Sequence, residues 1–340
     1  MGRSRVGAAL DAAYDSGGLF AFRNRIINGA MMIDQRNAGA SVTSDGSSYK
    51  YPVDRFAGYG DTSDGVFTLQ QSSAAPSGFN KSIKATVTTA DSSLSATNRY
   101  FIRQAIEGNN VADFGFGAAG ASTMTLSFWV RSSITGQHSG SILNDNFDRA
   151  YPYVFTISAA DTWEYKTVTI AGDTTGTWLK DNGAGMSVIW NLGAGSSRVG
   201  TSGAWQTPSM ALFGATGSVN VIATNGATFY ITGVQLEKGS TATSFDYRPY
   251  GTELALCQRY CYVNNDGYIM TGFNYSANYR GIFVQFPVVM RAQPTCTPTY
   301  TGGSWFQYSV SQYKFFAYAN ISYTDATGYQ LTNLIASAEL

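Results

Sequence analysis

Residues 124–131 read MTLSFWVR and decide the fold class, because apolar and polar side chains alternate along them. Successive side chains of a β-strand point to opposite faces, so Leu126, Phe128 and Val130 share one face. Trp129 lies on the other face among polar side chains. We therefore predict a strand with one core face, and we expect Trp129 to be a platform for a sugar ring or a subunit contact.

Similar runs lie on both sides of this stretch. Each is rich in β-branched and aromatic residues and is bounded by turn-forming residues, which is typical of strands. The predicted strands cover residues 66–71, 82–88, 100–106, 153–157, 163–170, 186–192 and 228–236. Many short strands without long helical periodicity indicate a β-sandwich or jelly roll.

A second β region follows one stretch of helical character, residues 253–260. Pro294 and Pro298 bracket a piece that fits an edge strand, because proline cannot donate a ladder hydrogen bond. Further strands are predicted at residues 281–289, 308–310 and 314–319. We read this region as a smaller, separate β domain.

The beginning of the chain carries one apolar stripe. Val6, Leu10 and Tyr14 are spaced four apart and share a face of a short predicted helix, which Gly17 and Gly18 end. A helix this short is not stable alone. It needs a partner surface, or it is a frayed terminus.

The composition is that of a chain with much buried surface. Lys+Arg and Asp+Glu both total 22, so the basic excess of a nucleic-acid binder is lacking. Only 13% of residues are charged and 14% are aromatic, including 22 tyrosines. Low charge and abundant tyrosine are typical of subunit interfaces, so we expect an oligomer.

The compartment can be argued from the cysteines and the first residues. Three cysteines do not make a disulfide framework, which favours free thiols in a reducing compartment. Asp11 and Asp15 interrupt any signal-peptide core after Arg3 and Arg5. No run of 18 apolar residues exists, so no membrane insertion is expected.

Three stretches resemble a recurring pattern of bacteriophage tail-fibre and other virion fibre proteins. The stretches are residues 24–29 (NRIING) with Gln35 and Arg36, residues 54–56 (DRF), and residues 233–260, with GVQLEKG, FDYRPYGTEL and CQRY in order. The resemblance covers about residues 24–260, and its last block is the most specific.

The resemblance implies a jelly-roll sandwich like a carbohydrate-binding module in a virion fibre that is usually trimeric. The first 23 and last 80 residues lie outside the resemblance, and there the residue patterns predict a short helical or extended N-terminal anchor and a smaller C-terminal β domain. Together these expectations describe an all-β subunit assembled as a homotrimer. The expected parts are an attachment segment at 1–24, the jelly roll at 25–250 and a tip at 251–340. Val6, Leu10 and Tyr14 are the candidate attachment residues, which would contact tail or head structural proteins.

The function that the resemblance implies is a virion fibre made in the host cytoplasm. We expect a tail fibre that recognises a host-surface glycan or protein during adsorption. The alternatives are a head-attached fibre or decoration protein, a carbohydrate-degrading depolymerase, and a carbohydrate-binding module of a cellular protein. The missing signal peptide argues against the last of these.

Catalytic chemistry finds little support in the sequence. The single histidine, His138, lies in a Gly/Ser-rich stretch read as a loop, and no motif selects a pair of carboxylates for glycoside hydrolysis. The oxygen-rich residues 144–148 (NDNFD) could bind calcium, but a polar turn fits them better. We expect no enzyme activity, catalytic residue, metal or other cofactor.

Aromatic side chains are the remaining candidates for glycan contact, because rings stack on the C–H faces of sugars. The candidates are Trp305, Tyr308, Tyr275, Tyr279 and Trp129. Trp305 follows a Gly-rich stretch typical of an exposed loop.

Overall fold

The computed structural model describes residues 23–46, 48–61, 64–265, 268–269, 274–276, 279–301, 304–320 and 330–340. The chain divides into two compact units, one up to Tyr247 and one over residues 248–339. The attachment candidates Val6, Leu10 and Tyr14 lie outside the described residues.

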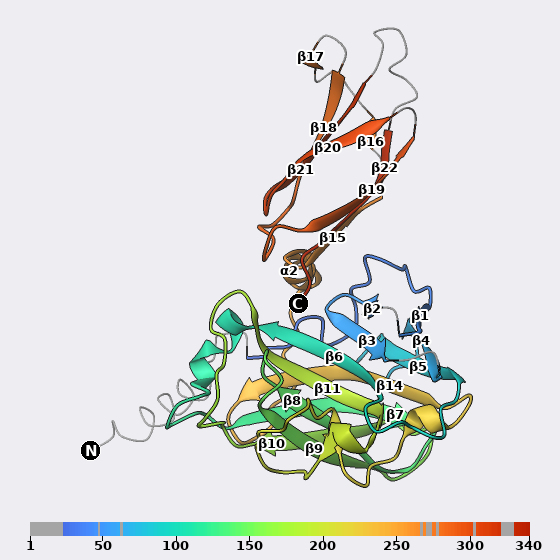
Figure 1. Cartoon of the computed structure of the whole chain (residues 1–340), viewed down its shortest axis with the longest axis vertical. Helices are drawn as coiled ribbons and strands as arrows, with labels where there is room; N and C mark the ends of the chain where they lie inside the picture. The colour runs from blue at the N-terminus through green and yellow to red at the C-terminus, as the bar shows by residue number, and fades with distance from the viewer. Residues whose placement is uncertain are drawn as a thin grey trace. The chain divides into compact units, whose positions relative to one another are not determined.

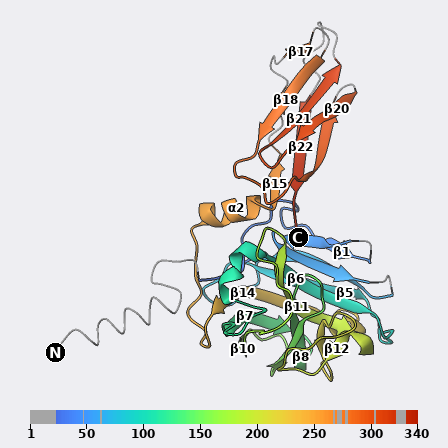
Figure 2. The same cartoon turned by 60° about the vertical axis from the view of Figure 1, so that its left-hand side comes forward.

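Two six-stranded antiparallel sheets stack face to face in the first unit (Figures 1 and 2). The first, which we call the front sheet, has the order β1-β4-β5-β14-β7-β10. Its strands are β1 (Val42–Ser44), β4 (Val66–Ser72), β5 (Ser82–Thr89), β14 (Thr228–Lys238), β7 (Met124–Ser132) and β10 (Glu164–Ile170). The predicted all-β sandwich of jelly-roll type is confirmed.

The second, which we call the back sheet, has the order β2-β3-β6-β11-β8-β9. Its strands are β2 (Lys50–Val53), β3 (Phe56–Gly60), β6 (Arg99–Glu107), β11 (Ala184–Ala194), β8 (Gly136–Leu143) and β9 (Ala150–Ile157). Two short strands, β12 (Val199–Gly200) and β13 (Gly214–Ala215), pair in parallel. Single-turn 3-10 helices cover Gly108–Asn110, Ala112–Phe114, Ser196–Arg198 and Val221–Ala223.

The core between the sheets follows the alternation of the sequence. Leu126, Phe128 and Val130 of β7 are fully buried in it, as predicted. Trp190 of β11 packs against Phe128 across the sandwich, with ring centroids 5.8 Å apart. Burial of such side chains contributes about 2 kcal/mol each, so the alternation fixes which face of each strand turns inward.

The two outer faces differ. On the back sheet, Phe101 and Ile189 point away from the main core and are covered by residues 211–213. Phe101 stacks on Phe213 with centroids 4.7 Å apart. This second cover explains why nearly every residue of β11 is buried, on both faces of the sheet. The outer face of the front sheet instead carries exposed aromatic and polar side chains.

The loop interpretation of His138 is wrong. His138 lies in β8, between β11 and β9, and is fully buried. Its Nε2 donates to the carbonyl oxygen of Ile134 at 2.8 Å, and its ring stacks on Phe155. Burial lowers the pKa of His138, against the opposing effect of that hydrogen bond. A neutral, enclosed imidazole packs the core rather than serving as a catalytic base.

The two asparagines of the NRIING stretch, Asn24 and Asn28, make buried hydrogen bonds with their side chains. Asn24 Nδ2 donates to Val234 O at 2.9 Å, and Asn24 Oδ1 accepts from Leu236 N at 3.1 Å. Asn28 bonds the carbonyl oxygens of Ile33 and Asp54 in the same way. Asn24 therefore ties the incoming chain to β14 and closes the jelly roll, whereas Asn28 holds the segment around Ile33 against Asp54.

The Gln35-Arg36 and Asp54-Arg55 parts of the pattern also contact each other. Asp54 is fully buried and accepts hydrogen bonds from Gln35, while Arg36 Nη1 lies 3.4 Å from its Oδ1. Arg55 donates to the carbonyl oxygen of Ala105 on β6. A buried carboxylate is tolerated only when it is paired and hydrogen-bonded, so these residues have a structural role.

The last block of the pattern joins the same network. Asp246 N donates to Gln235 Oε1 at 2.8 Å, and Asp246 Oδ2 accepts from the backbone N–H of Arg23 at 3.0 Å. Gln235 Nε2 donates to Glu237 Oε1 at 2.9 Å. The network therefore holds the two ends of the first unit side by side.

The second unit begins with helix α2 (Tyr250–Gln258), which contains the predicted helical stretch apart from its last residues. Two sheets follow, β15-β22-β16 with β19 on the other side of β22, and β17-β18-β21-β20. The strands are β15 (Cys261–Asn264), β16 (Tyr268–Ile269), β17 (Asn274–Ser276), β18 (Tyr279–Gln285), β19 (Thr295–Thr301), β20 (Trp305–Val310), β21 (Lys314–Asn320) and β22 (Gln330–Ser337).

The core of the second unit is separate from that of the first. It is formed by Phe315, Ala317, Leu334 and their neighbours. Pro298 lies in β19, which among the described strands pairs only with β22, as expected of a proline-containing edge strand. Cys257, Cys261 and Cys296 are free thiols. No helix among the described residues is long and apolar enough to cross a membrane.

Candidate functional site

An aromatic hollow of about 620 Å³ opens on the outer face of the front sheet. It lies over β7, β10 and β14 and is closed on one side by the segment that follows β14. The lining residues are Phe79, Ser127, Trp129, Tyr165, Gly233, Ala242, Thr243, Ser244, Phe245 and Tyr247. Its volume is in the range of small-molecule sites.

One wall of the hollow comes from the sheet itself. Trp129 on β7 stands directly opposite Tyr165 on β10, and their ring centroids are 5.4 Å apart. Tyr165 is 44% exposed and Trp129 is partly exposed. The indole N–H of Trp129 makes no hydrogen bond with the described residues. The pair therefore offers two ring faces and an available donor.

The opposite wall comes from loops far apart in the sequence. Phe79 contacts Phe245 and Tyr247 with ring centroids 5.1 and 5.6 Å apart, and Phe245 contacts Tyr247 at 4.8 Å. The Tyr247 hydroxyl donates to Gly78 O at 2.7 Å, which fixes a ring that is still 60% exposed. Its partial burial raises the pKa of Tyr247.

Gly233 joins the two walls at an irregularity of β14. The pairing of β14 with β7 shifts between Thr232 and Gln235, so Gly233 lies in a β-bulge and has a φ of +60°. A β-carbon at Gly233 would stand 2.7 Å from the Phe79 ring and 3.0 Å from Trp129. Bulges re-aim side chains next to sites, and this one lets both aromatic walls approach.

The mainly apolar lining of the hollow includes the hydroxyl-bearing residues Ser127 and Thr243. Thr243 Oγ1 donates to Glu237 Oε2 at 2.7 Å, and Glu237 Oε1 accepts from Gln235 Nε2. The buried carboxylate thus orients Thr243 instead of facing the hollow.

The hollow fits binding better than hydrolysis. None of its described lining residues is a carboxylate or a histidine, whereas glycoside hydrolysis needs two facing carboxyl groups. Aromatic walls beside the hydroxyl-bearing Ser127 and Thr243 match a sugar ring, which has apolar C–H faces and polar edges.

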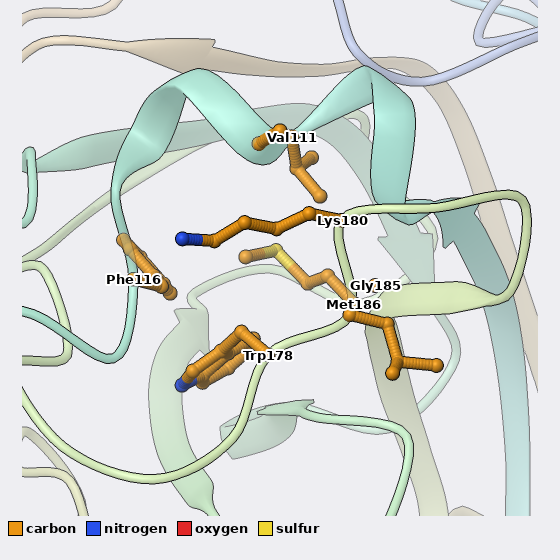
Figure 3. Close-up of a pocket in the computed structure, with 8 residues that line it drawn as sticks. Val111, Phe116, Trp178, Lys180, Gly185 and Met186 are labelled. Carbon is orange, nitrogen blue, oxygen red and sulfur yellow. The ribbon is translucent and has the colours of Figure 1, made fainter.

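A second pocket, shown in Figure 3, is too small for a ligand. Its free volume is about 10 Å³, room for a single water molecule. The Lys180 side chain lies between Val111 and Met186, and the rings of Phe116 and Trp178 close the other side (Figure 3).

Residues 144–148 form a polar turn. Asn144 Oδ1 accepts from the backbone N–H groups of Asp148 and Arg149 at 3.1 and 3.0 Å. Asn144 Nδ2 donates to Asp148 Oδ1 and to Thr177 O. Among the described residues, no group of three or more His, Cys, Asp or Glu side chains could hold a metal ion.

The aromatic candidates divide between the two units. Trp129 lines the hollow of the first unit. Trp305 is partly buried in the second unit, stacked on Tyr300 with centroids 4.4 Å apart, rather than on an exposed loop. Tyr308, Tyr275 and Tyr279 lie in β20, β17 and β18, and their side chains fall outside the described part.

Sequence reasoning missed most of the hollow. Phe79, Phe245 and Tyr247 come from turn-rich segments whose apposition depends on the fold. The alternation of ring and charge in residues 245–248 was a partial signal.

No family model matches the sequence, and no curated protein matches it. Solved structures with a similar fold include the enzymatically active domain of tailspike protein 4 of bacteriophage CBA120 (11% identity, 65% of this chain, TM-score 0.33). This chain spans only 22% of that tailspike chain.

Two other solved structures are matched over their full length. They are a putative sugar-binding protein from Bacteroides thetaiotaomicron (14% identity, 64% of this chain, TM-score 0.35) and TmCBM61 in complex with β-1,4-galactotriose (10% identity, 64% of this chain, TM-score 0.30). Similarities this weak identify neither a ligand nor an activity.

Proposed function

We propose that the first unit is a glycan-binding jelly roll and that the chain is a subunit of a bacteriophage fibre, with the aromatic hollow as its sugar site. The observation that carries the glycan-binding proposal is the hollow itself. Two ring walls, Trp129 with Tyr165 and Phe79 with Tyr247, line it beside the hydroxyl-bearing Ser127 and Thr243. Aromatic side chains that only packed a core would be buried, whereas Tyr165 and Tyr247 stay 44% and 60% exposed beside hydroxyl groups.

The fibre role rests on the sequence pattern and on what its residues do. Asn24 and Asp246 make buried or partly buried hydrogen bonds that hold the ends of the first unit together, and Asp54 accepts a hydrogen bond from Gln35. Residues that form such a network belong to the scaffold of the unit, which suits a virion fibre module. The homotrimer, the attachment of residues 1–24 and the virion location belong to the same proposal.

The glycan site is tested with full-length protein on an array of neutral and acidic bacterial surface polysaccharides. We expect retention of at least one polysaccharide, and about 30-fold weaker binding for Trp129→Ala, because a well-packed aromatic anchor contributes about 2 kcal/mol. Tyr247→Ala should also weaken binding.

The matched control is Tyr250→Ala. Tyr250 and Tyr247 are both 60% exposed, but only Tyr247 lines the hollow. Equal binding by the Tyr247 and Tyr250 variants, or no retained polysaccharide, would overturn the glycan site. The fibre role is tested separately by mass spectrometry of purified virions, which should contain the chain in multiples of three per fibre.

A further inference from the structure

A basic row of side chains crosses the outer face of the front sheet next to the hollow. Lys84 on β5 pairs in register with Tyr230 on β14, and Tyr230 pairs with Arg131 on β7. Lys84 Nζ lies 5.8 Å and Arg131 Cζ 5.0 Å from the centroid of the Tyr230 ring. Trp163 contacts the same ring at 6.0 Å. We call these four residues the basic row.

The basic row and the hollow share one face. Arg131 is two residues from Trp129 on β7, and Tyr230 is two residues from Thr232, the register partner of Trp129. Residues two apart on a strand point to the same side and are about 7 Å apart. A ligand that occupies the hollow and extends along β7 by one further sugar ring therefore reaches the basic row.

The basic row itself carries two positive charges. The Glu237 carboxylate on the same face is 3% exposed and is bonded to Gln235 and Thr243. Lys84 has no carboxylate within ion-pair distance among the described residues. Arg131 Nη2 lies 3.3 Å from Asp161 Oδ1, while its Nη1 makes no hydrogen bond with described residues. Glu164 of β10 stands opposite Val130, whose side chain points into the core, so that carboxylate belongs to the other face of the sheet.

The two cations are also held in place. Stacking of a Lys or Arg head on an aromatic face is favourable by about 0.5–1 kcal/mol at exposed sites. Both stack on Tyr230, which is 8% exposed and so well packed. Pre-positioned cations lose less side-chain entropy when an anion binds.

We propose that the glycan of this face is acidic: a carboxylate-bearing sugar, such as a uronic acid, binds with its carboxylate at Arg131, and Lys84 across the Tyr230 ring adds to the attraction, while a neighbouring ring occupies the hollow. This inference rests on the proposed glycan-binding function and adds the class of ligand. Asp161 limits the attraction, because it neutralises part of the charge of Arg131.

The test uses polygalacturonate, alginate and polysialate, with fully methyl-esterified polygalacturonate, mannan and galactan as neutral counterparts, on the same array. The acidic probes should bind preferentially, and binding should weaken when NaCl rises from about 50 to 500 mM, because salt screens exposed charges. The double variant Lys84→Gln/Arg131→Gln should bind the acidic probes about tenfold more weakly.

Two further variants sharpen the result. Asp161→Asn should strengthen binding of the acidic probes, the opposite direction from the double variant. Lys314→Gln is the matched control, because Lys314 also lies over an aromatic ring, that of Phe283 at 5.5 Å, but in the second unit.

The outcomes separate the two proposals. Equal binding of polygalacturonate and its methyl ester, without salt dependence, overturns the acidic ligand and leaves the hollow as a neutral glycan site. Binding of no probe at all overturns both. If the double variant does not fold, the salt dependence and Asp161→Asn still decide.

Discussion

Gly233 lies so close to Phe79 that a β-carbon at this position would be only 2.7 Å from Phe79 Cζ. Gly233→Ala should therefore displace the Phe79 wall and also strain a backbone with φ of +60°. The left-handed conformation alone costs about 1–2 kcal/mol for alanine. We expect a larger loss of unfolding free energy than that, together with loss of glycan binding.

Gly226→Ala separates strain from contact. Gly226 has φ of +78°, yet nothing lies within 4 Å of the position that the β-carbon of an alanine would take there. Chemical denaturation of both variants should show that Gly226→Ala loses only the conformational cost and keeps binding. Equal losses in the two variants would mean that the Phe79 contact does not shape the hollow.

The closure of the jelly roll can be measured at Asn24. Its side chain is 3% exposed and bonds Val234 O, Leu236 N and Ile26 N. Asn24→Ala leaves these groups without partners, at a cost of about 2–4 kcal/mol in unfolding free energy.

The control for Asn24 is Asn80→Ala, because Asn80 is exposed and makes no side-chain hydrogen bond with the described residues. It should stay within about 0.5 kcal/mol of the unmodified protein in urea denaturation. A change below 1 kcal/mol for Asn24→Ala would show that the network does not hold the ends of the unit.

The sequence predicts the strands of the first unit well where one face is buried and the other is not. The alternation at residues 124–131 identifies both the core face of β7 and the exposed position of Trp129. It fails at β8, whose residues 136–141 (GQHSGS) look like a loop. Gly140 shows why: the Tyr153 ring and Ile189 O lie where a β-carbon would stand, at 2.4 and 2.0 Å, so small residues are required there.

The hollow could be predicted only in part for a related reason. Trp129 is recognisable because its place on the outer face follows from strand periodicity alone. Phe79 and Tyr247 are 168 positions apart in the sequence (247 − 79), and their contact depends on the turn after β14. No local sequence pattern predicts a contact between residues so far apart in the chain. The register that forms the basic row is likewise a property of three paired strands.

His138 gives a pH dependence that can be isolated, because it is the only histidine. Burial lowers its pKa in the folded state. Between the unfolded pKa of about 6.5 and the lower folded pKa, only the unfolded chain binds the proton. Stability is therefore complete above pH 6.5 and falls as the pH drops below it, by at most about 1.4 kcal/mol per pH unit.

The measurement is urea denaturation between pH 6.5 and 5.5, where most carboxylates stay ionised. His138→Gln should remove the slope, since glutamine does not titrate and can still donate to Ile134 O. A slope that persists in His138→Gln would assign the pH dependence to another group.

Trp305 tests the difference between a ligand contact and a core contact in the second unit. Its ring lies parallel to that of Tyr300, at an angle of 7°, and packs against the core of the unit, while Nε1 donates to Thr301 O at 3.3 Å. Trp305→Ala should therefore lower the unfolding free energy of the second unit by about 2–3 kcal/mol.

The neighbouring Phe306 is 48% exposed and points to the other face of β20, so Phe306→Ala is the control and should change stability far less. Both variants are followed by thermal melting and by adsorption to host cells. A lower melting temperature for Trp305→Ala would assign the indole to packing, because a side chain that only bound glycan would leave the melting temperature unchanged. Unchanged melting with weakened adsorption would instead keep Trp305 as a glycan contact and contradict the packing role.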